Sequence, residues 1–297
     1  MTKRTAAQDP RWLDRDGVPI DEEDRGLVYD IGTLVNRRRV LGLFGGIGAA
    51  GLLAACSSGS SSSTPPAASP SSGTTTADGA ASGTSSATAG VTEVPDETGG
   101  PFPGDGSNGP NVLDDSGIVR SDIRSSFGSS TTTAEGVELT IRLTVREAAT
   151  GKAMPGAAVY VWHCTSDGSY SLYSPGFEGE NYLRGAQETD DSGTAEFTSV
   201  FPGCYPGRWP HIHFEVYGGL DDAVSSGPIV KTSQIALPEE ACTAVYATSG
   251  YEASVGNLAG TSLTGDLVFA DDGAIHQLAS MSGSAENGYV AALTIGV

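Results

Sequence analysis

The sequence predicts an all-β protein, an antiparallel β-sandwich with long loops and at most one or two short helices. Three observations lead to this prediction: apolar residues alternate with polar ones at period two, turn-forming clusters separate the alternating segments, and helical periodicity is nearly absent. Short strands that follow one another with turn signals between them are typical of two packed sheets.

The first expected strand has the most regular pattern. From Val137 to Val145, five apolar side chains alternate with polar ones, so one face of this strand is apolar throughout. Further strands are expected at 157–164, 194–200, 211–216 and 289–297. Clusters of Gly, Pro, Asp and Ser separate these strands, at 154–156, 190–193 and 201–203.

One short helix is expected at 238–247. Glu239 and Glu240 stand in its first turn, where negative charge complements the positive end of the helix dipole. No other segment after the first strand has a clear helical period, so the remaining connections are expected to be loops.

Composition divides the chain into three parts. Residues 1–55 end in an apolar segment preceded by arginines, an arrangement typical of an export signal. Residues 56–93 are mostly Ser, Thr, Gly, Ala and Pro, and they are expected to form a disordered tether because they offer little apolar surface to bury. Residues 94–297 are long enough for one domain with a substantial core.

The signal has two specific features. The tetrapeptide L-A-A-C that ends at Cys56 resembles a bacterial lipoprotein cleavage box, and the pair Arg37-Arg38 resembles a twin-arginine signal. The apolar segment 40–55 is shorter than the ~20 residues that span a bilayer, so an uncleaved membrane anchor is the less favoured alternative. We therefore expect an exported protein, held on the extracellular face of the cell membrane by a lipid on Cys56.

The chain is strongly acidic. Its formal net charge is −20, and the acidic residues of the leader are balanced by basic ones, so this charge rests on the exported part. Such a charge argues against a nucleic-acid partner and against electrostatic attachment to anionic lipid.

The stretch G-C-Y-P-G-R-W-P-H-I-H-F-E-V-Y carries the strongest chemical signal. His211 and His213 are two residues apart on an expected strand, so both imidazoles project from one face and form a ready pair of metal ligands. Taken alone, such a pair is more often two solvated surface histidines. Tyr205 and Tyr170 change this assessment, because two phenolates with two neutral histidines favour Fe(III) over Zn(II) or Cu(II).

With these residues, the domain resembles the intradiol ring-cleavage dioxygenases, the family of catechol and protocatechuate dioxygenases. The resemblance runs from about Pro95 to the C-terminus and rests on G-A-A-V-Y-V-W-H-C-T-S-D-G-S-Y-S, Y-L-R-G-A-Q-E-T-D, F-T-S-V-F-P-G-C-Y and G-R-W-P-H-I-H. It implies a non-haem Fe(III) site whose ligands are Tyr170, Tyr205, His211 and His213. It also implies a catechol-type substrate, cleaved with O2 between its two hydroxyl-bearing carbons to a muconate-type diacid.

The resemblance implies three further roles. Tyr205 is the axial ligand, which is released when the catechol binds and then accepts a catechol proton. Arg208, three residues before His211, stabilises charge that develops on the ring. Gln234, in T-S-Q-I-A-L-P, corresponds to a family glutamine beyond the histidine strand.

Two departures from the well-known family members are visible. The loop 206–210, between the second tyrosine and the first histidine, is shorter than theirs, which leaves the identity of the diol open. A tether takes the place of a helical dimerisation region, so a homo-oligomer is neither implied nor excluded. The alternative function is that of a non-catalytic surface β-sandwich module that binds a metal or a carbohydrate.

Several other residues carry expectations. Tyr182 is the alternative to Tyr170 as the first tyrosine ligand. His163 is expected to be a hydrogen-bonded structural histidine, and His276 is expected at the surface. Arg184 is expected in a structural ion pair rather than against a substrate carboxylate.

A disulfide is also expected. Cys204 directly precedes Tyr205, and Cys242 lies in the expected helix 238–247. A bond between the two sulfurs would fix the Tyr205 loop in place.

Overall fold

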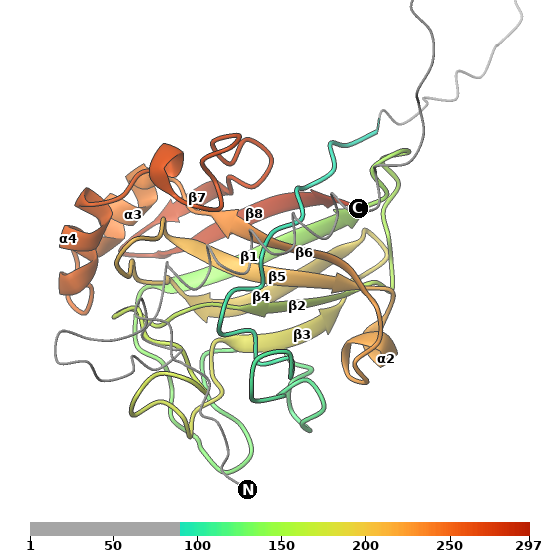
Figure 1. Cartoon of the computed structure of the whole chain (residues 1–297), viewed down its shortest axis with the longest axis horizontal. Helices are drawn as coiled ribbons and strands as arrows, with labels where there is room; N and C mark the ends of the chain where they lie inside the picture. Colours follow the sequence, from blue (N-terminus) through green and yellow to red (C-terminus); the bar gives the residue numbers. More distant parts are fainter. Residues whose placement is uncertain (1–89) are drawn as a thin grey trace, which may run out of the picture.

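The structure, a computed structural model, describes residues 90–297, and Figure 1 shows how their strands are arranged. The expected export signal, Cys56 and most of the expected tether lie outside the described residues. Two four-stranded sheets face each other, with the orders β4-β1-β8-β7 and β3-β2-β5-β6. The strands are β1 (Glu138–Arg146), β2 (Ala158–Trp162), β3 (Arg184–Glu188), β4 (Thr194–Val200), β5 (His211–Tyr217), β6 (Ile229–Ala236), β7 (Ser280–Ser284) and β8 (Gly288–Gly296).

The predicted β-sandwich is confirmed, and the five predicted strands correspond to β1, β2, β4, β5 and β8. The prediction of a wholly antiparallel arrangement is wrong at one place, because β1 and β8 pair in parallel, with Leu139 opposite Tyr289. Strands joined by a hairpin must run antiparallel, but β1 and β8 lie at opposite ends of the domain sequence and are free of that constraint.

Three strands were not predicted, namely β3, β6 and β7. The first two contain polar side chains that are nevertheless buried, among them Arg184, Lys231 and Gln234. The third, S-M-S-G-S, is polar and lies at the edge of its sheet. None of the three has the alternation of apolar and polar residues that identifies a strand in sequence.

The helices are short. Among the described residues they are α2 (Leu220–Ala223), α3 (Glu239–Tyr246) and α4 (Glu252–Ala259), with a 3-10 turn, η3 (Leu263–Gly265). The predicted helix is confirmed as α3, but three α-helices exceed the one or two expected. In Figure 1, α3 and α4 lie together at one end of the sheets. Nowhere in residues 90–297 is a helix long and apolar enough to cross a membrane.

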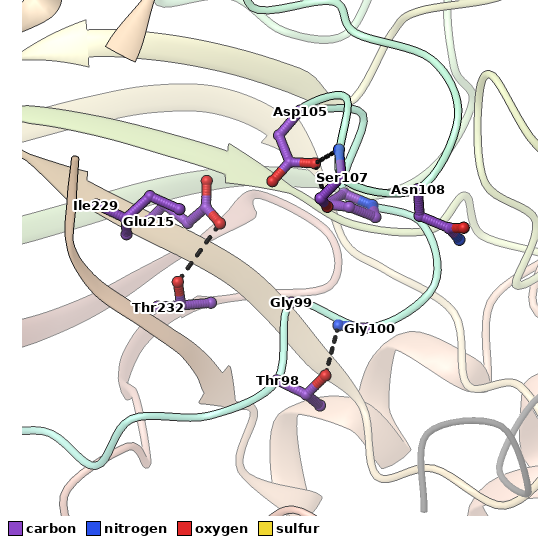
Figure 2. A pocket seen from close by; sticks show the side chains of 10 residues that line it. Thr98, Gly99, Gly100, Asp105, Ser107, Asn108, Glu215, Ile229 and Thr232 are labelled. Atoms are coloured by element: carbon purple, nitrogen blue, oxygen red, sulfur yellow. Dashed lines mark hydrogen bonds between the residues drawn. The ribbon is translucent and has the colours of Figure 1, made fainter. Parts of the chain in front are cut away.

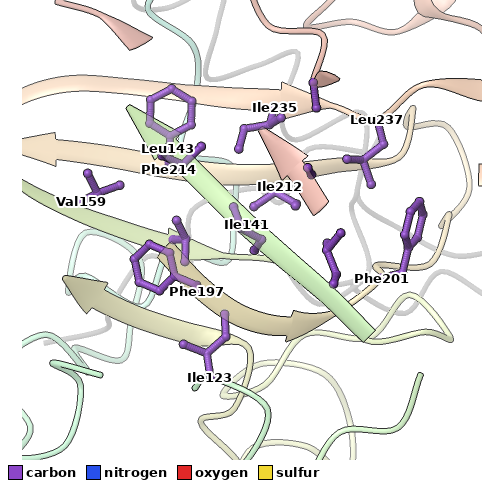
Figure 3. Close-up of a cluster of buried hydrophobic side chains, with 14 of the residues drawn as sticks. Ile123, Ile141, Leu143, Val159, Phe197, Phe201, Ile212, Phe214, Ile235 and Leu237 are labelled. Atoms are coloured by element: carbon purple, nitrogen blue, oxygen red, sulfur yellow. The ribbon is translucent and has the colours of Figure 1, made fainter. Parts of the chain in front are cut away.

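The main core fills the space between the two sheets, as Figure 3 shows. Alternate residues of β1, such as Ile141 and Leu143, pack there against Ile212 and Phe214 of β5. Because side chains alternate along a strand, burying Ile212 and Phe214 between the sheets turns the intervening histidines to the opposite face. The core thus determines the direction of the candidate metal ligands.

Candidate active site

Two histidines of β5 form the centre of the site. His211 and His213 are almost fully buried, at 2% and 3% exposure, and their Nε2 atoms are 3.1 Å apart. Their rings meet edge to face, with centroids 4.7 Å apart. They are therefore not the solvated surface pair that the H-x-H pattern alone would favour.

The backbone sets the tautomer of His211. Its Nδ1 lies 2.6 Å from the carbonyl oxygen of Trp209. Because a carbonyl can only accept, Nδ1 must carry the proton, and Nε2 presents a lone pair to His213. A carbonyl that orients an imidazole in this way is the usual partner of a metal-binding histidine.

Both imidazoles are held neutral. Burial, followed by the positive charge of Arg208, lowers the pKa of His211 to about 3. Burial also places the pKa of His213 well below its usual value, and the neighbouring His211 adds to this effect. Neutral imidazoles are the form that coordinates a metal.

Tyr205 reaches the same point from the loop before β5. Its hydroxyl lies 3.2 Å from Nε2 of His211. Two glycines allow this close approach. A side chain at Gly203 would overlap the Ser166 carbonyl, and one at Gly168, where φ is +91°, would lie 3.0 Å from Cβ of Tyr205. The P-G-C-Y and D-G-S-Y turns therefore pack directly against each other.

Tyr170 completes the group from the loop after β2. Its ring lies edge-on to Tyr205 at 5.9 Å and to His213 at 6.3 Å between centroids. Its buried hydroxyl has no hydrogen-bond partner among the described residues. Burial, together with the neighbouring Tyr205, raises the pKa of Tyr170 well above its usual value. A buried hydroxyl without a partner is costly, and a bound cation would compensate it.

The alternative ligand, Tyr182, lies elsewhere. It packs in a separate cluster with Ala134, Leu183 and Val200. Tyr173 is also close to the site, but its hydroxyl accepts a hydrogen bond from the backbone N–H of Gly104 at 2.9 Å. Tyr170 is thus the tyrosine of this loop whose hydroxyl is unsatisfied.

Arg208 and Gln234 lie beside the histidines. The register of β5 and β6 places Gln234 directly opposite His213. Its Oε1 accepts from Nη2 of Arg208 at 2.5 Å, and its Nε2 donates to the Thr98 carbonyl at 2.9 Å. Nη1 of Arg208 is 3.4 Å from Nε2 of His211. The two residues named by sequence are therefore adjacent to each other and to the histidine pair.

A sequence profile of the family described as "Dioxygenase" matches residues 109–220. This segment carries Tyr170, Tyr205, Arg208 and both histidines. Residues 109–220 belong to the dioxygenase family. Gln234 lies beyond the matched segment.

Named relatives agree with this assignment. Chlorocatechol 1,2-dioxygenase of Rhodococcus opacus is 40% identical over 55 residues, which cover 18% of this chain and 21% of the relative. Catechol 1,2-dioxygenase 1 of Acinetobacter lwoffii is 42% identical over 85 residues, which cover 22% of this chain and 27% of the relative. The matched parts thus span about a quarter of these relatives or less.

A solved structure shares the fold. The intradiol ring-cleavage dioxygenase from Tetranychus urticae superposes with a TM-score of 0.56 at 23% identity. The superposition covers 69% of this chain and 94% of that one. At this identity the likeness concerns the sandwich architecture alone.

Two residues around the candidate site were missed in the sequence. Trp162, opposite His213 in register, stacks on its imidazole with centroids 4.9 Å apart and planes at 6°. Asp266 accepts hydrogen bonds from Arg208 Nε at 3.0 Å and from the Trp209 backbone at 2.7 Å. Trp162 was visible in the sequence only as a strand residue, and no local motif marks Asp266 as a site residue, because Arg208 and Trp209 are far away in the chain.

Two other expectations concern residues close to the site. Arg184 is fully buried and donates to the carbonyl oxygens of Phe102 and Pro103, each at 2.9 Å, and to that of Ser171 at the same distance. It thus joins the Tyr170 loop to the N-terminal segment through backbone oxygens rather than through the ion pair that was expected.

The expected disulfide between Cys204 and Cys242 is wrong, because the cysteines of the described residues, Cys164, Cys204 and Cys242, are free thiols. Cys204 and Cys242 share the main core, but the sulfur of Cys204 lies 3.5 Å from the Arg208 carbonyl and that of Cys242 lies 3.9 Å from the Leu237 carbonyl. Each thiol thus has its own backbone acceptor, and the loop is fixed by hydrogen bonds instead: Asn257 donates to the Cys204 carbonyl at 2.7 Å.

The remaining expected structural residues can also be placed. His163 is buried, with Nε2 2.7 Å from the Ser199 hydroxyl and Nδ1 2.7 Å from the Cys164 carbonyl. It is a hydrogen-bonded structural histidine, as expected. His276 is half-buried rather than fully exposed.

A pocket lies beside the histidines, at Glu215, which follows His213 by two residues on β5 (Figure 2). It has a volume of about 250 Å³ and is lined by Thr98, Gly99, Gly100, Pro103, Asp105, Ser107, Asn108, Glu215, Ile229 and Thr232. Glu215 comes from β5, and Thr232 faces it across the sheet at 3.4 Å. The N-terminal segment forms the other wall. It also touches the site, since a Cβ on Gly100 would lie 3.2 Å from Cε1 of His213.

Proposed function

We propose that the chain is a non-haem iron dioxygenase that cleaves a catechol-type diol between its two hydroxyl-bearing carbons. One observation carries this proposal: in a buried site, Nε2 of His211 lies 3.2 Å from the Tyr205 hydroxyl and 3.1 Å from Nε2 of His213. The unsatisfied Tyr170 hydroxyl stands beside them. Membership of the dioxygenase family and the relatives named as catechol and chlorocatechol dioxygenases support the same reading.

The donor set fits ferric iron. Tyr170, Tyr205, His211 and His213 would hold the metal, with two neutral imidazoles and two phenols that lose their protons on binding. No group of three His, Cys, Asp or Glu side chains suited to a metal occurs among the described residues, so the phenols are essential to the site. When bound, Fe(III) would act as a Lewis acid that chelates the diol as a dianion and activates the ring of the diol toward O2.

Tyr205 is suited to accept a proton. Its side chain is half-buried, whereas Tyr170 is 2% exposed, so Tyr205 is the tyrosine that solvent and a substrate can approach. A phenolate at this position would take a proton from an incoming catechol hydroxyl within hydrogen-bond reach. Tyr170 would remain in place as the fixed donor.

Arg208 is suited to stabilise negative charge. Its guanidinium is 1% exposed, and its Nη1 points toward the group of donor atoms. In a water-poor site, a fixed positive charge interacts more strongly with a developing anion than it would in solvent. Trp162 and Phe102 provide apolar walls, since Trp162 stacks on His213 and Phe102 packs on Tyr170 at 4.7 Å.

Oxygen uptake tests the proposal. The full chain, loaded with iron, is mixed with catechol, protocatechuate, hydroxyquinol and larger lignin-derived diols. We expect one diol to consume one equivalent of O2 and to yield a conjugated diacid that absorbs in the ultraviolet. Iron binding without O2 uptake for any diol would instead support the alternative, a non-catalytic metal-binding module.

We also propose that the protein is exported and lipid-anchored at Cys56. The support is the L-A-A-C box that follows an apolar segment and a pair of arginines. Metabolic labelling with a fatty acid tests this: the wild type should incorporate the label and partition with membranes, and Cys56→Ala should do neither. Labelling of the Cys56→Ala protein would contradict the anchor.

A further inference from the structure

Asp266 is a buried carboxylate at the back of the site. It is fully buried and follows the 3-10 turn η3. Its Oδ2 accepts from Nε of Arg208 at 3.0 Å and from the backbone N–H of Trp209 at 2.7 Å. Its Oδ1 accepts from the backbone N–H groups of Val268 at 2.9 Å and Phe269 at 3.2 Å. Both oxygens are thus occupied, and the carboxylate cannot rotate without losing bonds.

The guanidinium of Arg208 is held on two sides. Nε donates to Asp266, and Nη2 donates to Oε1 of Gln234 at 2.5 Å. Nη1 remains at the edge that faces Nε2 of His211, 3.4 Å away. A planar guanidinium fixed at two corners has one orientation, so these two partners aim its third corner at the donor atoms.

The same carboxylate also acts on a histidine. Oδ2 of Asp266 fixes the N–H of Trp209, and the carbonyl of Trp209 accepts from Nδ1 of His211 at 2.6 Å. Two hydrogen bonds, both made by the backbone of Trp209, therefore connect Asp266 to Nδ1 of His211. One anion supports both the charge that faces the site and the imidazole beside it.

We propose that Asp266 is a positioning residue that sets the orientation of Arg208 and the tautomer of His211. This inference rests on the proposed function. The competing explanation is that Asp266 only neutralises a buried arginine and fixes its own loop, which any partner of equal charge or shape would do.

Asp266→Asn separates the two explanations. An asparagine keeps the shape but has one acceptor oxygen, so it must present an N–H₂ group either to Arg208 and Trp209 or to the two backbone donors of the loop. The matched control is Asp190→Asn, because Asp190 also accepts two backbone N–H groups, from Ser192 and Thr194, in a loop outside the site.

The first measurement needs neither iron nor turnover. Nitrogen-15 NMR of the histidine side chains in the metal-free full chain reports the tautomer of His211. We expect the Nδ1–H form alone in the wild type and in Asp190→Asn, and a mixture of both tautomers in Asp266→Asn. An unchanged His211 tautomer in folded Asp266→Asn would overturn the coupling to the histidine.

The second measurement is a double-mutant cycle on catechol turnover. We expect Asp266→Asn, compared with the wild type at equal iron content, to lower kcat by about 10- to 100-fold, with a change in KM of less than about threefold. In the Arg208→Gln background, the same change should cost at least about threefold less, because only the effect through His211 remains when no guanidinium is left to orient. Equal losses in both backgrounds would overturn the positioning of Arg208.

Two controls keep the outcome decisive. If Asp266→Asn alone does not fold, the double variant with Arg208→Gln removes the uncompensated charge, and its NMR tautomer then decides. If the wild type consumes no O2 with any diol, the proposed function fails, but the tautomer measurement still tests the structural role of Asp266.

Discussion

The Nε2 atoms of His211 and His213 lie 3.1 Å apart, deep in the protein, with the Tyr205 hydroxyl 3.2 Å from the first of them. Because Nε2 of His211 presents a lone pair, a contact this short requires either a proton on Nε2 of His213 or a cation between the two nitrogen atoms. Together with the Tyr205 hydroxyl and the unpartnered Tyr170 hydroxyl, this pair supports a cation site more strongly than either histidine does alone.

Removal of one imidazole should abolish metal binding. We expect His213→Gln to weaken Fe(III) binding by more than about 100-fold, because the loss of a direct ligand exceeds the 10- to 100-fold typical of changes around a site. The measurement is iron content after dialysis against a weak chelator. The control is His276→Gln, a half-buried histidine in the loop before β7 that is not among the proposed ligands, and this variant should retain iron. Equal iron retention by both variants would contradict the site.

Substitutions of Tyr170 and of Tyr182 should have different effects on the iron-loaded protein. Tyr170→Phe should remove a phenolate ligand, so that the visible charge-transfer absorption of the iron-loaded protein shifts or weakens and turnover falls by at least about 100-fold. Tyr182→Phe should leave the absorption unchanged, because Tyr182 packs in a separate cluster. The reverse pattern would make Tyr182 the ligand.

His163 should make the fold sensitive to acid. Burial lowers the pKa of His163 to about 4 from its usual 6.5, so its contribution to stability is fully present above about pH 6.5 and is lost as the pH falls toward 4. The loss amounts to at most about 3 kcal/mol. Denaturant unfolding of the wild type and of His163→Gln at several pH values measures it. Between pH 6.5 and 4, the free energy of unfolding should fall less steeply for the variant than for the wild type, whatever the absolute stability of the variant. Parallel plots of this free energy against pH would refute the prediction.

The pocket beside the site should discriminate between diols according to their charge. Asp105 and Glu215 place two carboxylates on its walls, so a diol that carries its own carboxylate should be disfavoured. We expect kcat/KM for protocatechuate to be at least about tenfold below that for catechol, and Asp105→Asn to narrow the gap. Ser107→Ala is the control, since it changes the same wall without changing charge. A preference for protocatechuate would show that the pocket does not receive the substituent.

The regular strands could be predicted from sequence, and β3 and β6 could not. Alternation identifies β1 because its inner side chains are apolar. By contrast, Arg184 and Lys231 are buried only because distant groups satisfy them: Lys231 binds Glu93 at 2.8 Å and Asp96 at 3.1 Å. Such compensation depends on tertiary contacts and leaves no local pattern.

The candidate site likewise contains residues that could be predicted from sequence and residues that could not. Short motifs located the histidines and Tyr205, because their spacing on one strand and its preceding loop fixes their positions. Asp266 was not predicted, since its partners at the site, Arg208 and Trp209, lie more than fifty residues away in the chain. The Cys204–Cys242 disulfide failed for the opposite reason, because proximity in the core does not by itself align two sulfurs.

Product analysis under oxygen-18 gas tests the central claim most directly. The iron-loaded protein is incubated with the diol that gives the fastest O2 uptake, and the product is analysed by mass spectrometry. The account predicts a muconate-type diacid that carries two labelled oxygen atoms, one in each new carboxyl group. A semialdehyde from cleavage beside the diol, an unlabelled quinone, or no product from a protein that has bound iron would contradict it.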